Sequence, residues 1–321
     1  MNLIKKTIYV ITLLASVSCS NSRATDGAGR GDGATIAAET TPQELPLPAV
    51  PDTLRSVEER AAYVVEHYWD AMDFTDRRLS LDTAFIEQNF ANFISILPVA
   101  PEAVADSAVR KLLDRSAVDP EALALITATA ETYLDHPNSP MRDEETYILF
   151  LRNIIASPRL TDDEKLRPRH RLEEALKNRP GTAATDFSIL LRDGSTSTLS
   201  KLLSRADATL LIFYDPDCDH CKQIIGQIAE VSFPAGVQVL AVDAEDDRDL
   251  WQQTAATLPA GWQVGFATTP ILDRELYTLP ASPTLYVISS EGTVIMKDAN
   301  VDRALSYLAG SDPKRAASPS R

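Results

Sequence analysis

Two cysteines lie two residues apart in the motif Cys218-Asp219-His220-Cys221. The motif follows an apolar run at 208–214, which is typical of a strand buried on both faces, and it opens a predicted helix. Unpaired amides and the positive end of the helix dipole stabilise a thiolate at a helix start, and the thiolate is the attacking species in disulfide exchange. The arrangement therefore predicts that Cys218 reacts first and that Cys221 can resolve the mixed disulfide.

Other uses of this cysteine pair need partners that the sequence does not supply. A structural zinc site needs four ligands, but there is no second cysteine pair, and His67, His136 and His170 lack metal-ligand spacing. Copper carriers of similar type usually separate their cysteines by three residues and add a distant histidine, and neither sign is present. We therefore expect no metal and no cofactor.

The residues around the motif alternate between two secondary-structure periods. Strands are predicted at 186–191, 208–214, 237–242, 284–288 and 293–296, and helices at 219–231, 247–257, 271–277 and from Val301. Turns are predicted at Asp193-Gly194 and Glu291-Gly292. Strands that alternate with helices around one sheet are typical of an α/β fold.

An all-α helical bundle is predicted before this region. Ser56 and Glu59 form a capping box at the start of the first helix, and Asp119-Pro120 suits the start of a later one. Five or six helices are expected up to about residue 178. Because no fixed repeat length emerges, the pattern predicts a small irregular bundle and not a solenoid.

The first residues predict export from the cytoplasm. Lys5 and Lys6 precede an apolar run at 8–15, shorter than the ~20 residues that a membrane-spanning helix needs. The run stops at Ser-Val-Ser-Cys, residues 16–19, which resembles the lipobox of bacterial lipoproteins except that Ser16 replaces the usual Leu. The resemblance implies that Cys19 is lipidated, and soluble secretion is the alternative. Either route leads to a compartment where protein disulfides can persist.

The C-terminal elements resemble the thioredoxin fold, in which a cis-proline faces the cysteine pair. The resemblance lies in a strand, the Cys-x-x-Cys motif, a helix, and Ser282-Pro283-Thr284 opening a later strand. Pro283 lies 62 positions after Cys221 (283 minus 221), and the extra length is similar to the insertion of TlpA/ResA-type proteins. The whole chain is similar to exported bacterial lipoproteins in which an N-terminal domain of unknown function precedes a thioredoxin-like domain.

The resemblance implies roles for several residues. Cys218 would be the nucleophile and Cys221 the resolving thiol, while Ser282, next to Pro283, would offer backbone hydrogen bonds to an extended substrate. His220 matches the position of a histidine in oxidising relatives. The sequence departs from thioredoxin at two positions: Asp217 replaces a Trp, and Ile212 replaces a buried acid, so that the usual proton acceptor is missing.

Peroxiredoxins share this fold, and they need a Thr three residues before the reactive cysteine. Asp215 occupies that position, so we expect no rapid peroxide turnover.

The nearby carboxylates of Asp215, Asp217 and Asp219 oppose a thiolate at Cys218 by like charge, whereas His220 can stabilise it. The direction of electron flow is therefore open.

Composition limits the partners. The chain has 321 residues and a formal net charge of −15, which argues against nucleic acid as a partner because such binding depends on Lys and Arg.

We expect a signal peptide at 1–18, a flexible linker at 19–52, a helical domain at 53–180, a thioredoxin-like domain at 181–311 and a disordered tail at 312–321.

Two functional hypotheses follow. The leading one is an exported thiol-disulfide oxidoreductase, lipid-anchored in the cell envelope of a Gram-negative bacterium and facing the periplasm. Its partners would be exported proteins with thiols or disulfides and an unidentified membrane electron donor or acceptor. The alternative is a partner-binding lipoprotein, in which the helical domain grips a protein and the thioredoxin-like part is a scaffold or redox switch.

Overall fold

The computed structural model describes residues 44–245 and 247–310. The predicted signal peptide, the lipidation site Cys19 and the predicted tail from 312 lie outside these residues. No helix within the two described stretches combines the length and apolar content needed to cross a bilayer.

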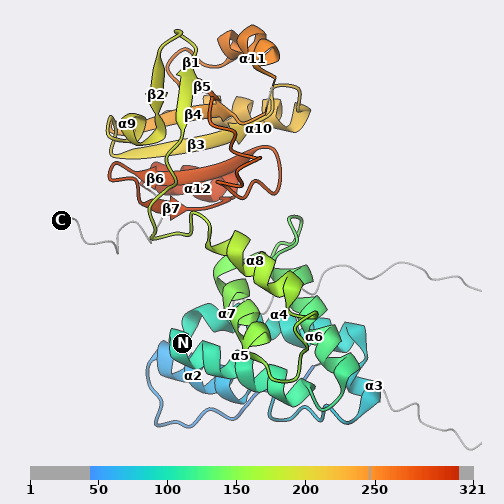
Figure 1. The fold of residues 1–321 in the computed structure, drawn as a ribbon. Helices are drawn as coiled ribbons and strands as arrows, with labels where there is room; N and C mark the ends of the chain where they lie inside the picture. The colour runs from blue at the N-terminus through green and yellow to red at the C-terminus, as the bar shows by residue number, and fades with distance from the viewer. Residues whose placement is uncertain (1–43, 246, 311–321) are drawn as a thin grey trace, which may run out of the picture. The chain divides into compact units, whose positions relative to one another are not determined.

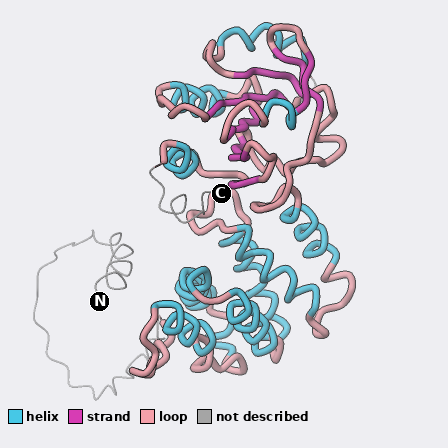
Figure 2. The backbone as a smooth tube through the Cα atoms, turned by 90° about the vertical axis from the view of Figure 1, so that its left-hand side faces the viewer, coloured by secondary structure: helices cyan, strands magenta, loops and turns pink. Residues whose placement is uncertain are grey.

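The region up to residue 178 is helical, as predicted, and its described part forms no strand (Figure 2). Its α-helices are α2 (Val57–His67), α3 (Arg77–Ser80), α4 (Thr83–Ile96), α5 (Glu102–Ser116), α6 (Pro120–Leu134), α7 (Glu144–Ala156) and α8 (Leu166–Leu176), with a 3-10 turn, η1 (Leu97–Val99), after α4. The capping box at Ser56 and Glu59 is confirmed. Asp119 caps α6, and Pro120 occupies its first turn. The short α3 is an addition to the predicted helices.

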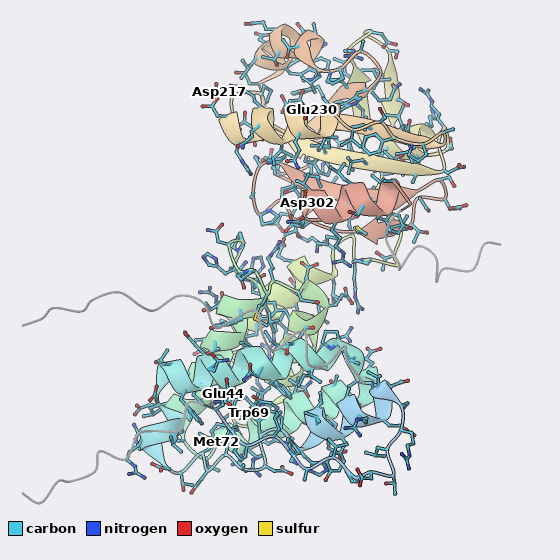
Figure 3. All side chains as sticks on the ribbon, turned by 180° about the vertical axis from the view of Figure 1, so that it is seen from behind. Glu44, Trp69, Met72, Asp217, Glu230 and Asp302 are labelled. Carbon is cyan, nitrogen blue, oxygen red and sulfur yellow. The ribbon has the colours of Figure 1, made fainter. Side chains whose placement is uncertain are left out.

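The core of the helical region is aromatic. Phe90, Phe93 and Phe150 are completely buried, and Figure 3 shows Trp69 and Met72 among the helices. Leu45 is only 9% exposed and belongs to the same core. Its backbone N–H donates to the Oδ1 atom of the buried Asn89 at 2.8 Å. The end of the stretch predicted as a linker therefore packs onto the helices, because one apolar side chain and one backbone donor find buried partners there.

The second region contains a seven-stranded mixed sheet in the order β2-β1-β5-β4-β3-β6-β7 (Figure 1). The strands are β1 (Ser188–Leu191), β2 (Thr196–Thr198), β3 (Ala208–Tyr214), β4 (Val237–Asp243), β5 (Gln263–Ala267), β6 (Thr284–Ser289) and β7 (Val294–Met296). Its helices are α9 (Leu199–Leu203), α10 (Asp219–Ala229), α11 (Arg248–Thr254) and α12 (Val301–Leu308), with a 3-10 turn, η2 (Ala255–Thr257), after α11. β3 runs parallel to β4 and antiparallel to β6.

The two faces of the sheet have separate apolar cores. Alternate residues of β3 point to opposite faces: Ile212 and Tyr214 pack with α10, α11 and α12, whereas Leu211 and Phe213 pack on the side of α9. Because both faces are covered, every residue of β3 is buried. This explains the unbroken apolar run that marks the strand in the sequence.

The structure differs from the predicted elements at two places between α11 and β6. The helix predicted at 271–277 is wrong: hydrogen-bonded turns occupy this segment, and Glu275, with φ +48°, leaves the helical conformation. Strand β5 was not predicted, because it is short and contains Gly265. A Cβ at Gly265 would lie 2.2 Å from Ile189 Cγ2, so glycine is required where β5 meets β1.

Candidate active site

Cys218 is the N-cap residue of α10. Its backbone is extended, with φ −78° and ψ 117°, and its Sγ accepts the Cys221 backbone N–H at 3.3 Å. The side chain is half-buried, which leaves the sulfur accessible. An N-cap acceptor normally satisfies one of the free amides of the first helical turn. Here the sulfur has that role, and the same N–H can stabilise it as a thiolate.

Cys221 occupies a different environment in the first turn of the same helix. It is 1% exposed and packs in the core between the sheet and α10. Burial is the main cause that raises the pKa of its thiol to about 12. The neighbouring Cys218 and the Asp215 carboxylate raise it further, and a hydrogen bond with the Asp215 backbone opposes them. Both cysteines are free thiols in the structure. The helix start thus carries one half-buried and one buried cysteine.

The segment Ser282-Pro283 lies beside Cys218. The Ser282–Pro283 peptide bond is cis, and the Cys218 thiol donates to the Ser282 carbonyl oxygen at 3.7 Å. Ser282 is exposed and Pro283 is half-buried, and β6 begins directly after them. The fold thus brings together residues that are 64 positions apart in the chain.

The surface around Cys218 carries many charges. Asp217 precedes the start of α10, as Figure 3 shows, and it is exposed together with Asp219 and His220. Lys222 forms an ion pair with Asp219 at 3.1 Å, and this hydrogen bond is the main cause that raises the pKa of Lys222. His220 is therefore exposed in the first turn of α10, where it can meet a partner or solvent.

Asp215 occupies the position where peroxiredoxins have Thr. Its Oδ1 accepts the backbone N–H of Asp217 at 2.8 Å, and its backbone oxygen accepts the N–H of Cys218. The carboxylate is therefore engaged in shaping the turn before α10.

In the described residues, no three His, Cys, Asp or Glu side chains are grouped to hold a metal ion.

A small cavity of about 50 Å³ adjoins the Ser282 segment. Tyr214, Glu245, Leu272 and Ala281 are among the residues that line it. Leu272 is 43% exposed, so the rim of the cavity offers an apolar contact on the side of the cis-proline segment.

A cluster of buried polar groups lies behind the cysteines, and sequence reasoning missed it. Asp243 ends β4 and is completely buried. Its Oδ1 accepts the backbone N–H of Glu245 at 2.8 Å, but its Oδ2 has no hydrogen-bond partner among the described residues. The Tyr214 hydroxyl and Trp251 Nε1 are likewise buried without a hydrogen bond of regular geometry in the described part of the chain, although the indole N–H acts on the hydroxyl and lowers its pKa. Buried polar groups are normally paired, so these three need an explanation.

One signal in the sequence points to this cluster. Val239, Ala241 and Asp243 alternate along β4, so all three share one face. An acidic residue at the buried end of such a strand, paired with the end of the strand that precedes the cysteines, is a candidate partner for them. Recognising it requires the pairing of β4 with β3, which the sequence pattern does not specify.

Comparison with known proteins agrees with this architecture. The family model described as "Domain of unknown function (DUF5106)" matches residues 18–178. A solved thioredoxin-like protein from Bacteroides caccae is 36% identical with a TM-score of 0.76, and the match covers 85% of this chain and 100% of that one. No match is found among curated proteins.

Two further solved structures match a smaller share of this chain. A conserved protein of unknown function from Bacteroides fragilis is 34% identical with a TM-score of 0.38, over 41% of this chain and 99% of that one. The thioredoxin domain of a thiol-disulfide oxidoreductase from Bacteroides vulgatus is 11% identical with a TM-score of 0.31, over 40% and 97%.

The predicted fold class is confirmed, because the chain has a mixed α/β sheet region, a helical region before it and a thioredoxin-like relative that aligns with both. The chain therefore belongs to the DUF5106 family, and in it a thioredoxin-like domain follows the helical region that defines the family.

Proposed function

We propose that the protein is an exported thiol-disulfide oxidoreductase that acts on protein disulfides through Cys218 and Cys221. One observation carries the proposal: the accessible Cys218 sulfur receives the Cys221 N–H at the helix start and lies 3.7 Å from the Ser282 carbonyl oxygen. An attacking sulfur thus lies next to a backbone segment that can pair with an extended substrate.

The reaction proceeds by two exchanges. The Cys218 thiolate attacks a substrate disulfide, forms a mixed disulfide and releases one substrate thiolate, which takes a proton. The Cys221 thiol then loses its proton and attacks the Cys218 sulfur. A Cys218–Cys221 disulfide forms, the second substrate thiol leaves, and the substrate has gained the two electrons that the cysteine pair has lost. Oxidation of a substrate follows the same steps in reverse.

The place of action proposed here is the bacterial cell envelope. In this proposal Cys19 carries the lipid that tethers the chain to a membrane, facing the periplasm, and a membrane protein exchanges electrons with the cysteine pair. A Cys19→Ala variant of the full-length chain tests the anchor. We expect it to move from the membrane fraction to the soluble fraction of the cell envelope, and a variant that stays in the membrane fraction would contradict lipid anchoring.

Disulfide chemistry is tested with the full-length chain. We expect it to catalyse insulin reduction by dithiothreitol or the refolding of scrambled ribonuclease. Cys218→Ser abolishes both activities because the nucleophile is lost, whereas Gln223→Ala, an exposed position on the same helix, leaves them unchanged. A chain that shows neither activity, with Cys218 present and reduced, refutes the enzymatic proposal.

Trapping identifies the partners. In Cys221→Ser the mixed disulfide cannot be resolved, so exported substrates and the electron donor stay bonded to Cys218 and can be identified from cells. Trapping also distinguishes an oxidoreductase from a partner-binding protein. A partner-binding protein retains its partners in Cys218→Ser, since the helical region would bind them, whereas an oxidoreductase loses them.

A further inference from the structure

The second exchange has a requirement that the two cysteines do not meet alone. Cys221 is buried, and burial raises the pKa of its thiol to about 12. A thiol attacks only as a thiolate, so a group near Cys221 must take its proton when the mixed disulfide is resolved. The position that carries a buried acid in thioredoxin is Ile212 here.

The pairing of β3 with β4 supplies an acid at another place. Tyr214 and Asp243 are partners in the parallel ladder, each at the end of its strand. Both side chains point to the face that holds Cys221, since Tyr214 and Cys221 share one core and Asp243 continues the alternation of Val239 and Ala241. In the sheet, Tyr214 and Asp243 are therefore neighbours on the cysteine side.

Tyr214 senses both the acid and the sulfur. Its hydroxyl is buried, and both Asp243 and Cys221 act on it electrostatically, so that each raises the pKa of the phenol beyond the effect of burial. Among the described residues the hydroxyl makes no hydrogen bond of regular geometry, although the Trp251 indole N–H acts on its oxygen as a donor, and Asp243 Oδ2 has no partner either. One donor and one acceptor are thus left unpaired next to the buried thiol.

We propose that Asp243 accepts, through the Tyr214 hydroxyl, the proton that Cys221 loses when it resolves the mixed disulfide. The inference rests on the proposed function, and it assigns the group that replaces the missing acid. As the Cys221 sulfur attacks Cys218, its proton passes to the tyrosine oxygen while the tyrosine proton passes to Asp243 Oδ2. Asp243 then gives up this proton, either to the leaving substrate thiolate or to water, and the carboxylate is restored; in the second case the thiolate takes its own proton from water.

The charges that face Asp243 suit this role. Burial is the main cause that raises its pKa to about 7, and the carboxylates of Glu245, Asp215 and Asp247 raise it further, against the lowering effect of the Glu245 N–H. A carboxylate with a pKa near neutrality takes and returns a proton more readily than one with its ordinary value. Tyr214 stays protonated before and after the transfer, because its own pKa is raised.

The experiment separates the two exchanges in the reduced full-length chain with Cys19→Ala, in which Cys218 and Cys221 are the remaining thiols. The probe is 5,5′-dithiobis(2-nitrobenzoate), a small disulfide whose coloured thiolate is released once when Cys218 attacks and once when Cys221 resolves. Stopped-flow absorbance measures both phases as a function of pH. In Asp243→Asn we expect the first phase to be unchanged and the second to slow by on the order of 10²-fold, the lower end of what a general base contributes.

The pH profile distinguishes a proton acceptor from a merely structural residue. The second phase of the wild-type chain should show an inflection near the pKa of Asp243, and Asp243→Asn should lose it, while Asp243→Glu restores part of it. Tyr214→Phe should slow the same phase. Asp247→Asn is the matched control, because it makes the same change at an exposed carboxylate that raises the pKa of Asp243. It should keep the rate of the second phase and its inflection, with the inflection moved to a slightly lower pH.

Two results overturn the inference. One is a second phase in Asp243→Asn with the wild-type rate and pH profile. The other is an equal slowing of both phases, which indicates a general disturbance of the site. Because the probe is a small molecule, these results do not depend on insulin or ribonuclease assays. Failure of the protein substrates with a normal two-phase reaction would therefore count against the proposed function and not against the proton acceptor.

Discussion

Ionisation of Asp243 should destabilise the folded protein, and this can be measured without any assumption about function. Asp243 is completely buried and has one oxygen without a partner in the described residues. Its pKa is raised from the ordinary 3.8 to about 7. A tenfold change in proton affinity corresponds to about 1.4 kcal/mol, so the folded state loses about 4 kcal/mol of stability through this group once the pH is above 7.

The sign follows from proton binding. Below pH 3.8 the carboxyl group is protonated in both the folded and the unfolded state, so its ionisation does not change the free energy of unfolding. Between pH 3.8 and about 7 the unfolded chain releases this proton while the folded chain keeps it, so stability falls as the pH rises. Above about pH 7 both states are ionised, and the loss becomes constant. Asp243→Asn removes this contribution and should be more stable than the wild-type chain at pH 8.

The assay is urea unfolding of the reduced full-length chain between pH 4 and pH 8.5. A Trp69→Phe background restricts the fluorescence signal to Trp251 and Trp262, which both lie in the sheet region. The quantity of interest is the difference in the free energy of unfolding between Asp243→Asn and its background. Other carboxyl groups cancel in that difference. Parallel stability curves for the two proteins across this pH range would refute the assignment of a buried, raised carboxyl group at residue 243.

Three further predictions concern the scaffold. Leu45→Ala should destabilise the helical region by roughly 2–3 kcal/mol because the side chain packs in its core. Urea unfolding followed by Trp69 fluorescence in a Trp251→Phe, Trp262→Phe background checks this, and an unchanged midpoint would contradict the packing. Gly265→Ala should lower the free energy of unfolding by about 1–3 kcal/mol, since the new methyl group meets Ile189. Thermal unfolding measures this, and an unchanged midpoint temperature would contradict the close approach of β5 to β1. Ser56→Ala should cost about 1 kcal/mol through the lost N-cap of α2, measured by urea unfolding, whereas Ser56→Asp should retain the stability of the wild-type chain.

The cysteine motif and the buried strand before it could be predicted from the sequence because their signals are local. An apolar run such as β3 marks a strand covered on both faces, and two cysteines at the following helix start need no distant information. The segment at 271–277 was predicted wrongly because apolar residues at 271, 276 and 277 suggest a helix, whereas the backbone at Glu275 has a positive φ. Strand β5 depends on Gly265 fitting against Ile189, which is a tertiary contact and leaves no periodic signal.

The buried acid illustrates why part of a site escapes a motif comparison. The thioredoxin motif has a carboxylate six residues before its first cysteine, and this chain has Ile212 at that position. Ile212 lies inside β3 and pairs with Ala241 of β4. One pleat farther along the same face, the next pair in the ladder is Tyr214 and Asp243. At the end of β4 the carboxylate can accept the N–H of Glu245, whereas in the middle of a strand the neighbouring N–H groups are used by the ladder. Moving the acid to the strand end therefore leaves it buried beside the tyrosine with only one oxygen satisfied, which is what a proton acceptor requires.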